Sequence, residues 1–177
     1  DHASPERQMQ LAVLAFTGMR SGELQMLRQA DVDLDNGWIH VLARQDWVPK
    51  NRQSRKIPIH PRLRTYLETK AENQGPFFFT ALPSRKFPQG NHHINIKHLN
   101  ESLQRLAKRL GLPTGRKANG LVVHSLRHFF ETECVKGGIP QRVIDIWMGH
   151  TGDRSMGRVY YHLGDKESQS FMAKVPF

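Results

Sequence analysis

The sequence predicts an α+β fold that is mainly helical and carries one small antiparallel sheet of about three strands. Several segments repeat apolar residues at helical spacing, for example from about His93 to Leu110. A strand-like segment follows the turn sequence Asp35-Asn36-Gly37. Gly and Pro residues mark where the segments end. These observations predict a helical domain with a single small sheet.

The N-terminal elements are two helices followed by strands. Pro5 stands in the first turn of a helix that Gly18 ends, and Ser21 is the expected N-cap of a short helix that runs to Arg28. Strand-forming residues predict three strands, at 38–42, 47–48 and 55–59. A polar turn from Lys50 to Ser54 separates the last two strands.

Helices dominate the rest of the chain. We expect one from Pro61 to about Asn73, where Gly75-Pro76 ends it, followed by a short strand or buried loop at 77–82 and a loop at 83–90. A Gly/Pro loop rich in Arg and Lys is expected at 111–120. The three remaining helices are expected at about 93–110, 125–136 and 140–149.

The length of 177 residues suits one domain, or one domain and a tail. The chain has no apolar run of about 18 residues and no signal-like segment at its start, so we expect neither a membrane span nor secretion. The lone Cys134 excludes an internal disulfide and is typical of a reducing compartment. Because the chain begins at Asp1 and not at Met, we expect a piece of a longer intracellular protein.

Basic residues outnumber acidic ones by 26 to 16, which gives a formal net charge of +10. Two stretches, 48–67 and 102–130, contain basic residues and no acidic residue. One such cluster could be a solvated basic face, but two of them favour a polyanionic partner, nucleic acid. The residues that we assign to DNA contact are Arg52, Arg55, Lys56, Arg105, Lys108, Arg109, Arg116 and Lys117.

Residues suited to phosphoryl chemistry occur in a fixed order along the chain. Arg20 lies in Thr-Gly-Met-Arg-Ser-Gly-Glu-Leu, Arg127 lies in His-Ser-Leu-Arg-His, and Gly149-His150 precedes a Tyr-Tyr pair. In this combination, from about Leu11 to Leu163, the chain resembles the catalytic domain of the tyrosine recombinases, the phage-integrase family of DNA strand-exchange enzymes. The resemblance implies the helical catalytic fold of DNA breaking-rejoining enzymes.

The resemblance assigns Arg20 and Arg127 to a clamp on the phosphate that is cut. Arginine suits this role because it offers two parallel donors and stays charged at any working pH. Glu23 would support Arg20, although the two residues could simply form an i,i+3 ion pair.

Lys50 is the residue that the resemblance places on a mobile turn, where it would protonate the departing 5′ oxygen. Its distance from the Lys-Ile-Pro-Ile segment at 56–59 matches the family pattern. Lys50 could instead be a solvated turn lysine, and Arg52 and Lys56 remain rivals for the role.

The resemblance assigns two histidines, His124 and His150, to hydrogen bonds with the phosphate. His124 could instead cap a helix, and His150 could be a cation at a helix C-terminus. His128 is expected to support the site structurally. A metal site is a weaker hypothesis because the other candidate histidines lack a Cys, Asp or Glu at ligand spacing; they are His92, His93 and His98.

Tyr160 is the expected nucleophile, which would leave a 3′-phosphotyrosine and a free 5′ hydroxyl. The family usually places this tyrosine nine residues after the histidine, at Val159 here, so the segment carries one extra residue, at about Gly152. His162 stands two residues after Tyr160, as in many family members, and this favours Tyr160 over Tyr161.

The resemblance therefore implies a site-specific recombinase or integrase that cleaves and rejoins double-stranded DNA without a metal, a cofactor or ATP. We expect a homo-tetramer on DNA, a monomer in free solution, and a cytoplasmic location at the nucleoid. A catalytically inactive DNA-binding module of the same fold is one alternative function, which the shifted tyrosine favours. A nicking-closing enzyme of the type IB topoisomerase kind is another.

Two regions are expected in the chain, a catalytic domain at 1–163 and a C-terminal tail at 164–177. The tail could be disordered, or Phe171 and Met172 could anchor it on a neighbouring subunit. The resemblance also implies a further N-terminal helical domain that, together with the catalytic domain, would clamp the duplex.

Overall fold

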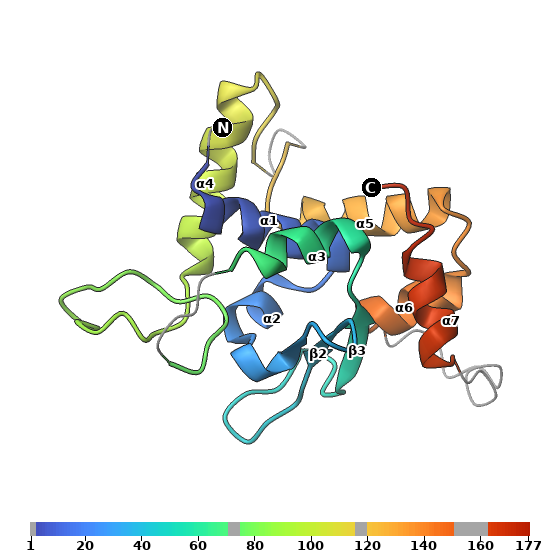
Figure 1. Ribbon diagram of the computed structural model, residues 1–177. Coiled ribbons are helices and arrows are strands. Elements are labelled where there is room, and N and C mark those ends of the chain that lie inside the picture. The colour runs from blue at the N-terminus through green and yellow to red at the C-terminus, as the bar shows by residue number, and fades with distance from the viewer. Residues whose placement is uncertain (1–2, 71–74, 116–119, 151–162) are drawn as a thin grey trace.

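Seven α-helices and one three-stranded sheet form the part of the chain that the computed structural model describes, residues 3–70, 75–115, 120–150 and 163–177. The helices surround a buried core, and the sheet lies on one side of it (Figure 1). This architecture confirms the predicted mainly helical α+β class. No helix in the described ranges is both long enough and apolar enough to span a bilayer.

Helix α1 (Pro5–Thr17) runs through the centre of the molecule and packs against α5 (Ser125–Lys136). Ser4 caps its N-terminus, and Gly18 ends it in the left-handed conformation with φ of 62°. A Cβ atom at Gly18 would lie 2.4 Å from the ring of Phe130. Glycine is therefore required here both by the backbone turn and by the close approach of α5.

Helix α2 (Ser21–Met26) is shorter than predicted and ends before Arg28, and its N-cap residue is Arg20, whose amide donates to Glu23 Oε2, and not the expected Ser21. Its end is fixed by pairing with a distant segment, since the amide of Phe78 donates to the carbonyl of Leu27 at 2.8 Å. A 3-10 turn (Gln29–Asp31) follows.

The sheet has the order β1-β2-β3 and is antiparallel throughout. Its strands are β1 (Val32–Asp33), β2 (Trp38–Val41) and β3 (Arg55–Pro58). The predicted number of strands is correct, but the predicted strand at 47–48 is wrong. Arg44 and Trp47 bond to each other across a local turn, so this segment closes on itself, and Val32–Asp33 takes the third place in the sheet.

The predicted helix from Pro61 is α3 (Pro61–Glu68), which ends earlier than expected; residues 71–74 lie outside the described ranges. His60 caps it, because its Nδ1 accepts from the amide of Arg62 at 3.1 Å. The segment at 77–82 is the buried-loop alternative, with the Phe79 ring fully buried and isolated bridges in place of a strand.

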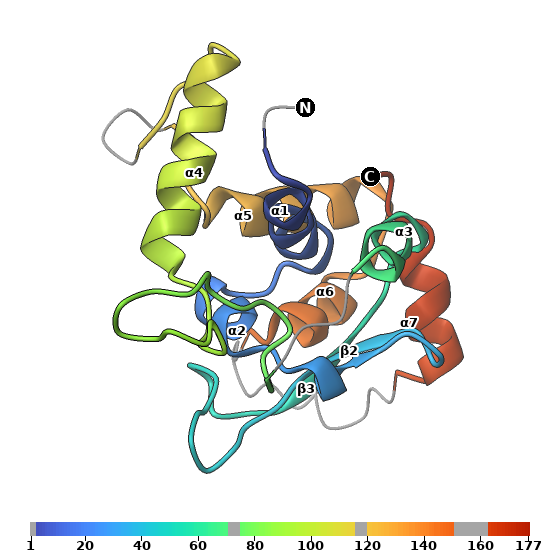
Figure 2. The same cartoon turned by 60° about the vertical axis from the view of Figure 1, so that its left-hand side comes forward.

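Helix α4 (Ile96–Arg109) stands out from the body, as the two ribbon views show (Figures 1 and 2). Helix α6 (Gln141–Met148) lies deeper and ends at Gly149, which is left-handed with φ of 65°. Its residue Trp147 is fully buried in the core beside Phe130, the two ring centroids being 6.3 Å apart.

The C-terminal segment forms a helix, α7 (Asp165–Met172), so the expectation of a disordered tail is wrong. The indole Nε1 of Trp147 donates to Ser168 Oγ at 2.9 Å, and Met172 is only 1% exposed. The ring of Phe177 packs 4.4 Å from that of Phe16. Met172 is thus buried in the core of its own chain. It could anchor the tail on a neighbouring subunit only if α7 left this position.

Candidate active site

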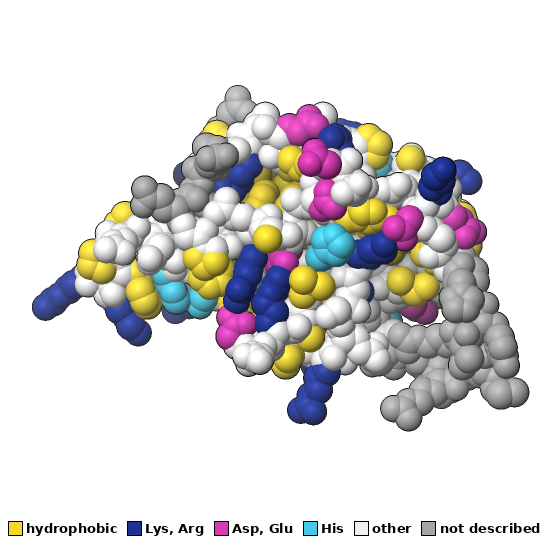
Figure 3. Space-filling model, turned by 60° about the horizontal axis from the view of Figure 1, so that its bottom comes forward, with side chains coloured by type: hydrophobic (Ala, Val, Ile, Leu, Met, Phe, Trp, Pro, Cys, Tyr) yellow, Lys and Arg dark blue, Asp and Glu magenta, His cyan; other side chains and the backbone are white. Residues whose placement is uncertain are grey.

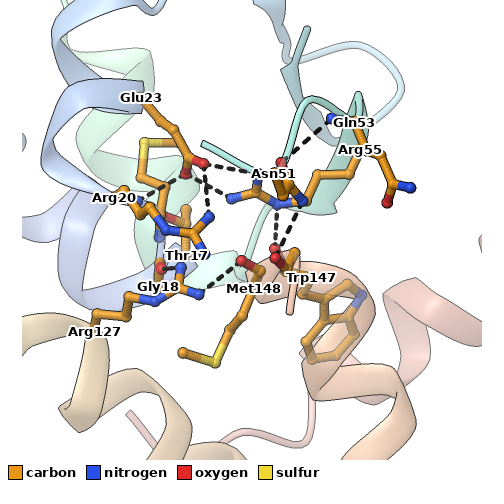
Figure 4. A network of polar contacts seen from close by, with 12 residues as sticks. Thr17, Gly18, Arg20, Glu23, Asn51, Gln53, Arg55, Arg127, Trp147 and Met148 are labelled. Carbon is orange, nitrogen blue, oxygen red and sulfur yellow. Dashed lines mark hydrogen bonds and ion pairs between the residues drawn. The ribbon is translucent and has the colours of Figure 1, made fainter. Parts of the chain in front are cut away.

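Arg127 lies on α5, at one edge of a polar network that joins residues of α2, α6 and β3 and the end of α1 (Figure 4). Its guanidinium donates to the carbonyls of Gly18 and of Met148, the latter at 2.8 Å from Nη2. The side chain joins the end of α1 to the end of α6. Burial, and then the charge of Arg20, lowers the pKa of Arg127 to about 10, so the group stays protonated at neutral pH.

Arg20 precedes α2 and is partly exposed beside Arg127 (Figure 4). Its backbone amide donates to Glu23 Oε2 at 2.8 Å, and its Nη1 lies 3.2 Å from Glu23 Oε1. Glu23 therefore caps the helix on which it lies and also orients the arginine. Arg20 and Glu23 thus form the pair that was expected from the sequence.

Glu23 is 2% exposed and is shared with a second arginine, Arg55 of β3. Arg55 forms two parallel bonds with it, Nη1 to Oε1 at 3.0 Å and Nη2 to Oε2 at 2.6 Å. Burial alone would raise the pKa of Glu23, but hydrogen bonds and charge from Arg55, with a smaller contribution from Arg20, hold it below its usual value. The carboxylate is ionised between two cations.

Arg55 was expected on the DNA-contacting surface, and the structure corrects this. Its side chain is only 6% exposed, and its Nε donates to the carbonyl of Trp147 at 2.7 Å. Arg55 shares a strand face with the buried Ile57, because side chains alternate along a strand. The alternation of Arg55 and Ile57 was the sequence signal that could have placed this arginine inside.

Lys50 lies in the β2–β3 connection, in a turn that the amide of Arg52 closes by donating to Pro49 O at 2.8 Å. Lys50 is exposed at this turn. The next residue, Asn51, donates from Nδ2 to the carbonyl of Gly149 at 3.1 Å. The turn that carries Lys50 is thereby attached beside His150.

His150 follows the left-handed Gly149 and is partly exposed. Its amide donates to Asp145 O at 2.9 Å, and its ring Nδ1 lies 3.2 Å from Asp145 Oδ1. His124 precedes α5 and is exposed, and its ring meets that of His128 edge to face at 4.9 Å between centroids. His128 thus lies where it can orient His124.

The expectations for Tyr160, Tyr161, Arg116 and Lys117 fall outside the described residues. The other residues assigned to DNA contact differ in environment. Arg52 is exposed on the β2–β3 turn, and the expected basic residues of α4 are exposed: Arg105, Lys108 and Arg109. Lys56, on the strand face opposite Arg55, is held 2.6 Å from Asp165 Oδ2 and 4.3 Å from the Trp38 ring centroid.

The face in Figure 3 carries Lys and Arg side chains, some of which project away from the body of the molecule.

On the loop before α4, His92 stacks on Phe87 with 3.8 Å between ring centroids and lies beside His93. In the described ranges no three His, Cys, Asp or Glu side chains are grouped so that they could hold a metal ion.

Two guanidinium groups, those of Arg20 and Arg55, contact the Glu23 carboxylate, and a third, that of Arg127, lies beside Arg20 (Figure 4). The cluster therefore keeps a net positive charge, and Arg20 is its partly exposed member. Such a site is suited to binding an anion with oxygen ligands, and most directly a phosphate.

The family model described as the phage integrase family matches residues 2–167, and the chain belongs to this family. A tyrosine recombinase of Thermosipho africanus is 23% identical over 165 residues, which are 93% of this chain and 52% of that protein. Tyrosine recombinase XerD of Staphylococcus epidermidis is 27% identical over 160 residues, 89% of this chain and 50% of that protein. The chain spans about half the length of these curated relatives.

Solved structures show the same fold. The integrase from mycobacterium phage Brujita superposes with a TM-score of 0.71 at 18% identity, over 98% of this chain and 52% of that chain. The XerH site-specific recombinase bound to its difH substrate gives 0.60 at 22% identity, over 94% of this chain and 45% of that chain. The family resemblance and the fold inferred from the motifs are thereby confirmed.

Proposed function

We propose that this chain is the catalytic domain of a site-specific DNA recombinase that cuts and rejoins strands through a 3′-phosphotyrosine link. The observation that carries the proposal is the convergence of Arg20 and Arg127 on one net-positive site, although a long stretch of sequence separates them. Family membership and relatives named tyrosine recombinases support the same reaction.

In the proposed reaction Arg20 and Arg127 hold the non-bridging oxygens of the phosphate and stabilise the extra charge of its pentacoordinate state. The oxygen of Tyr160 bonds to phosphorus as its proton passes to water, and the bond from phosphorus to the 5′ oxygen breaks. Lys50 gives a proton to that 5′ oxygen. His124 and His150 donate hydrogen bonds to the phosphate.

The phosphotyrosine link keeps the energy of the phosphodiester, so a second 5′ hydroxyl can reverse the step and exchange strands. Neither ATP nor a metal is needed in this scheme. The partner is double-stranded DNA, as the XerH complex with difH supports, and we propose a homo-tetramer on DNA. Such an enzyme would work in the cytoplasm at the nucleoid.

A catalytically inactive DNA-binding module is the second candidate. The observation in its favour is the position of Tyr160, one residue later than the family usually has it. The fold and the arginine cluster would serve binding alone in that case.

Covalent trapping separates the two candidates. Duplexes with a bridging 5′-phosphorothiolate release a thiol that needs no general acid and religates poorly, so a cleaving enzyme accumulates as an adduct. We expect wild type and Tyr161→Phe to form the adduct and Tyr160→Phe to lose it, with the site mapped by mass spectrometry. DNA binding without any adduct in the full-length protein would favour the inactive module.

A further inference from the structure

The connection between β2 and β3 is attached to the end of α6 by two side chains that the family motifs do not include. Asn51 donates from Nδ2 to the carbonyl of Gly149 at 3.1 Å, and Arg55 donates from Nε to the carbonyl of Trp147 at 2.7 Å. Among the described residues, the Asn51 bond is the one hydrogen bond from the 49–52 turn to another element. Asn51 therefore supplies the hydrogen bond that holds this turn against the end of α6.

The contact is close enough to restrict what stands at the end of α6. A Cβ atom at Gly149 would lie 2.9 Å from Asn51 Nδ2 and 3.1 Å from Arg55 Cδ. The residue is also left-handed, with φ of 65°. Glycine thus allows the turn and β3 to approach the helix end directly, and His150 follows at once.

Arg55 of β3 also links the end of α6 to Glu23, the partner of Arg20 in the proposed phosphate clamp. Arg55 forms two bonds with the Glu23 carboxylate, which also pairs with Arg20. Its Nε donates to the carbonyl of Trp147 in the last turn of α6. Figure 4 shows Arg55 between Glu23 on one side and Trp147 on the other. The Arg55 side chain therefore fixes the position of Arg20, through Glu23, relative to the end of α6.

We propose that Asn51 and Arg55 are positioning residues that fix where the Lys50 ammonium lies relative to the arginine clamp. Lys50 adjoins Asn51 in a turn of which Pro49 is buried and Lys50 and Arg52 are exposed, so loss of the Asn51 bond removes the hydrogen bond that holds this turn at the helix end. Proton transfer requires close placement of donor and acceptor, and a small displacement has a large effect on rate. The inference rests on the proposed function, in which Lys50 is the general acid.

The test compares cleavage of two otherwise identical duplexes, one with an ordinary phosphodiester and one with a bridging 5′-phosphorothiolate. We expect Asn51→Ala to slow cleavage of ordinary DNA by at least about tenfold. On the phosphorothiolate, whose leaving group needs no proton, it should cleave at close to the wild-type rate. Lys50→Ala should show the same selective rescue. Gln53→Ala, at an exposed position two residues further along the connection, is the matched control and should resemble wild type on both substrates.

Asn51→Asp serves as a second variant, because it keeps the shape of the side chain but cannot donate to the Gly149 carbonyl; it should behave as Asn51→Ala even if the alanine variant folds poorly. Arg55→Lys, which keeps the charge but not the paired bonds, should slow ordinary cleavage with partial rescue by the phosphorothiolate. The positioning role would be overturned if both Asn51 variants lost cleavage rate equally on the two substrates, or lost none on either. Cleavage by the wild type in the same experiment would still uphold the proposed function. Absence of wild-type cleavage on either substrate would overturn both.

Discussion

Glu23 is the residue on which the charge balance of the site depends. It is buried between two guanidinium groups, those of Arg20 and Arg55, and caps α2 with one oxygen. Removing one member of a buried ion pair leaves the others uncompensated, and this destabilises a fold far more than the loss of a surface pair.

We therefore expect Glu23→Gln to lower the free energy of unfolding by roughly 3 kcal/mol at neutral pH. The pKa of Glu23 is lower in the folded chain than its ordinary value of 4.5, so the carboxylate stabilises the fold above that value and ceases to do so as the pH falls through its folded pKa. The difference between wild type and Glu23→Gln in urea unfolding should shrink as the pH is lowered below about 4.5.

The matched control is Glu68→Gln, which removes an exposed i,i+4 partner of Arg64 on α3. It should change the free energy of unfolding by less than about 1 kcal/mol at any pH. A pH-independent difference for Glu23→Gln would show that its charge does not provide the stabilisation.

At the scale of elements, α7 completes the core. Its Met172 is buried in the core, and its Ser168 accepts a hydrogen bond from the buried indole of Trp147 on α6. Lys56 of β3 holds the start of the same helix through Asp165. Through these contacts α7 supports the C-terminal end of α6, which Gly149 and His150 follow.

Ser168→Ala should destabilise the chain by about 1–3 kcal/mol, because the indole N–H of Trp147 is left buried without its acceptor. Thermal unfolding would detect this as a lower Tm. Ser170→Ala, on the exposed side of the same helix, should stay within about 0.5 kcal/mol of wild type. Equal effects of the two substitutions would mean that the indole finds another acceptor or that helix propensity dominates.

At the scale of the whole molecule, basic residues fall into two groups. Some are held in ion pairs inside or across elements, as Arg55 and Lys56 are. Others project from α4, which stands out from the body (Figures 1 and 2). The net charge of +10 therefore overstates the charge that is free to meet DNA.

Lys108→Ala should weaken DNA binding more or less uniformly across sequences and reduce the salt slope of log Kd by about one, if this exposed lysine meets one phosphate. Lys136→Ala is the control of equal charge change and should leave the slope unchanged, since Lys136 is paired with Glu133 at 2.7 Å and is not among the residues assigned to DNA contact. Titrations at several salt concentrations give both slopes. Identical slopes for the two variants would remove α4 from the DNA-contacting surface.

Some helix ends could be predicted from the sequence, because Pro and Gly signals act on their neighbours in the chain, whereas α2 and α3 end earlier than predicted. Pro5 and Gly18 bound α1, and the predicted span from Ser125 to Lys136 is that of α5. The sequence also determined the family, since the arginine and histidine motifs and their order are read directly from it. The pairing of Arg20 with Glu23, three residues apart, was accessible for the same reason.

Which residues far apart in the chain come into contact is visible only in the folded structure. There Val32–Asp33 pairs with β2 in place of the 47–48 segment, the C-terminus folds onto Trp147, and Arg55 is a buried partner of Glu23 and not a surface cation. Local preferences give no information about such contacts, because the stabilisation comes from burial and from charge pairing between segments far apart in the chain. An arginine in a strand has the same local signature whether its strand face meets solvent or a buried carboxylate.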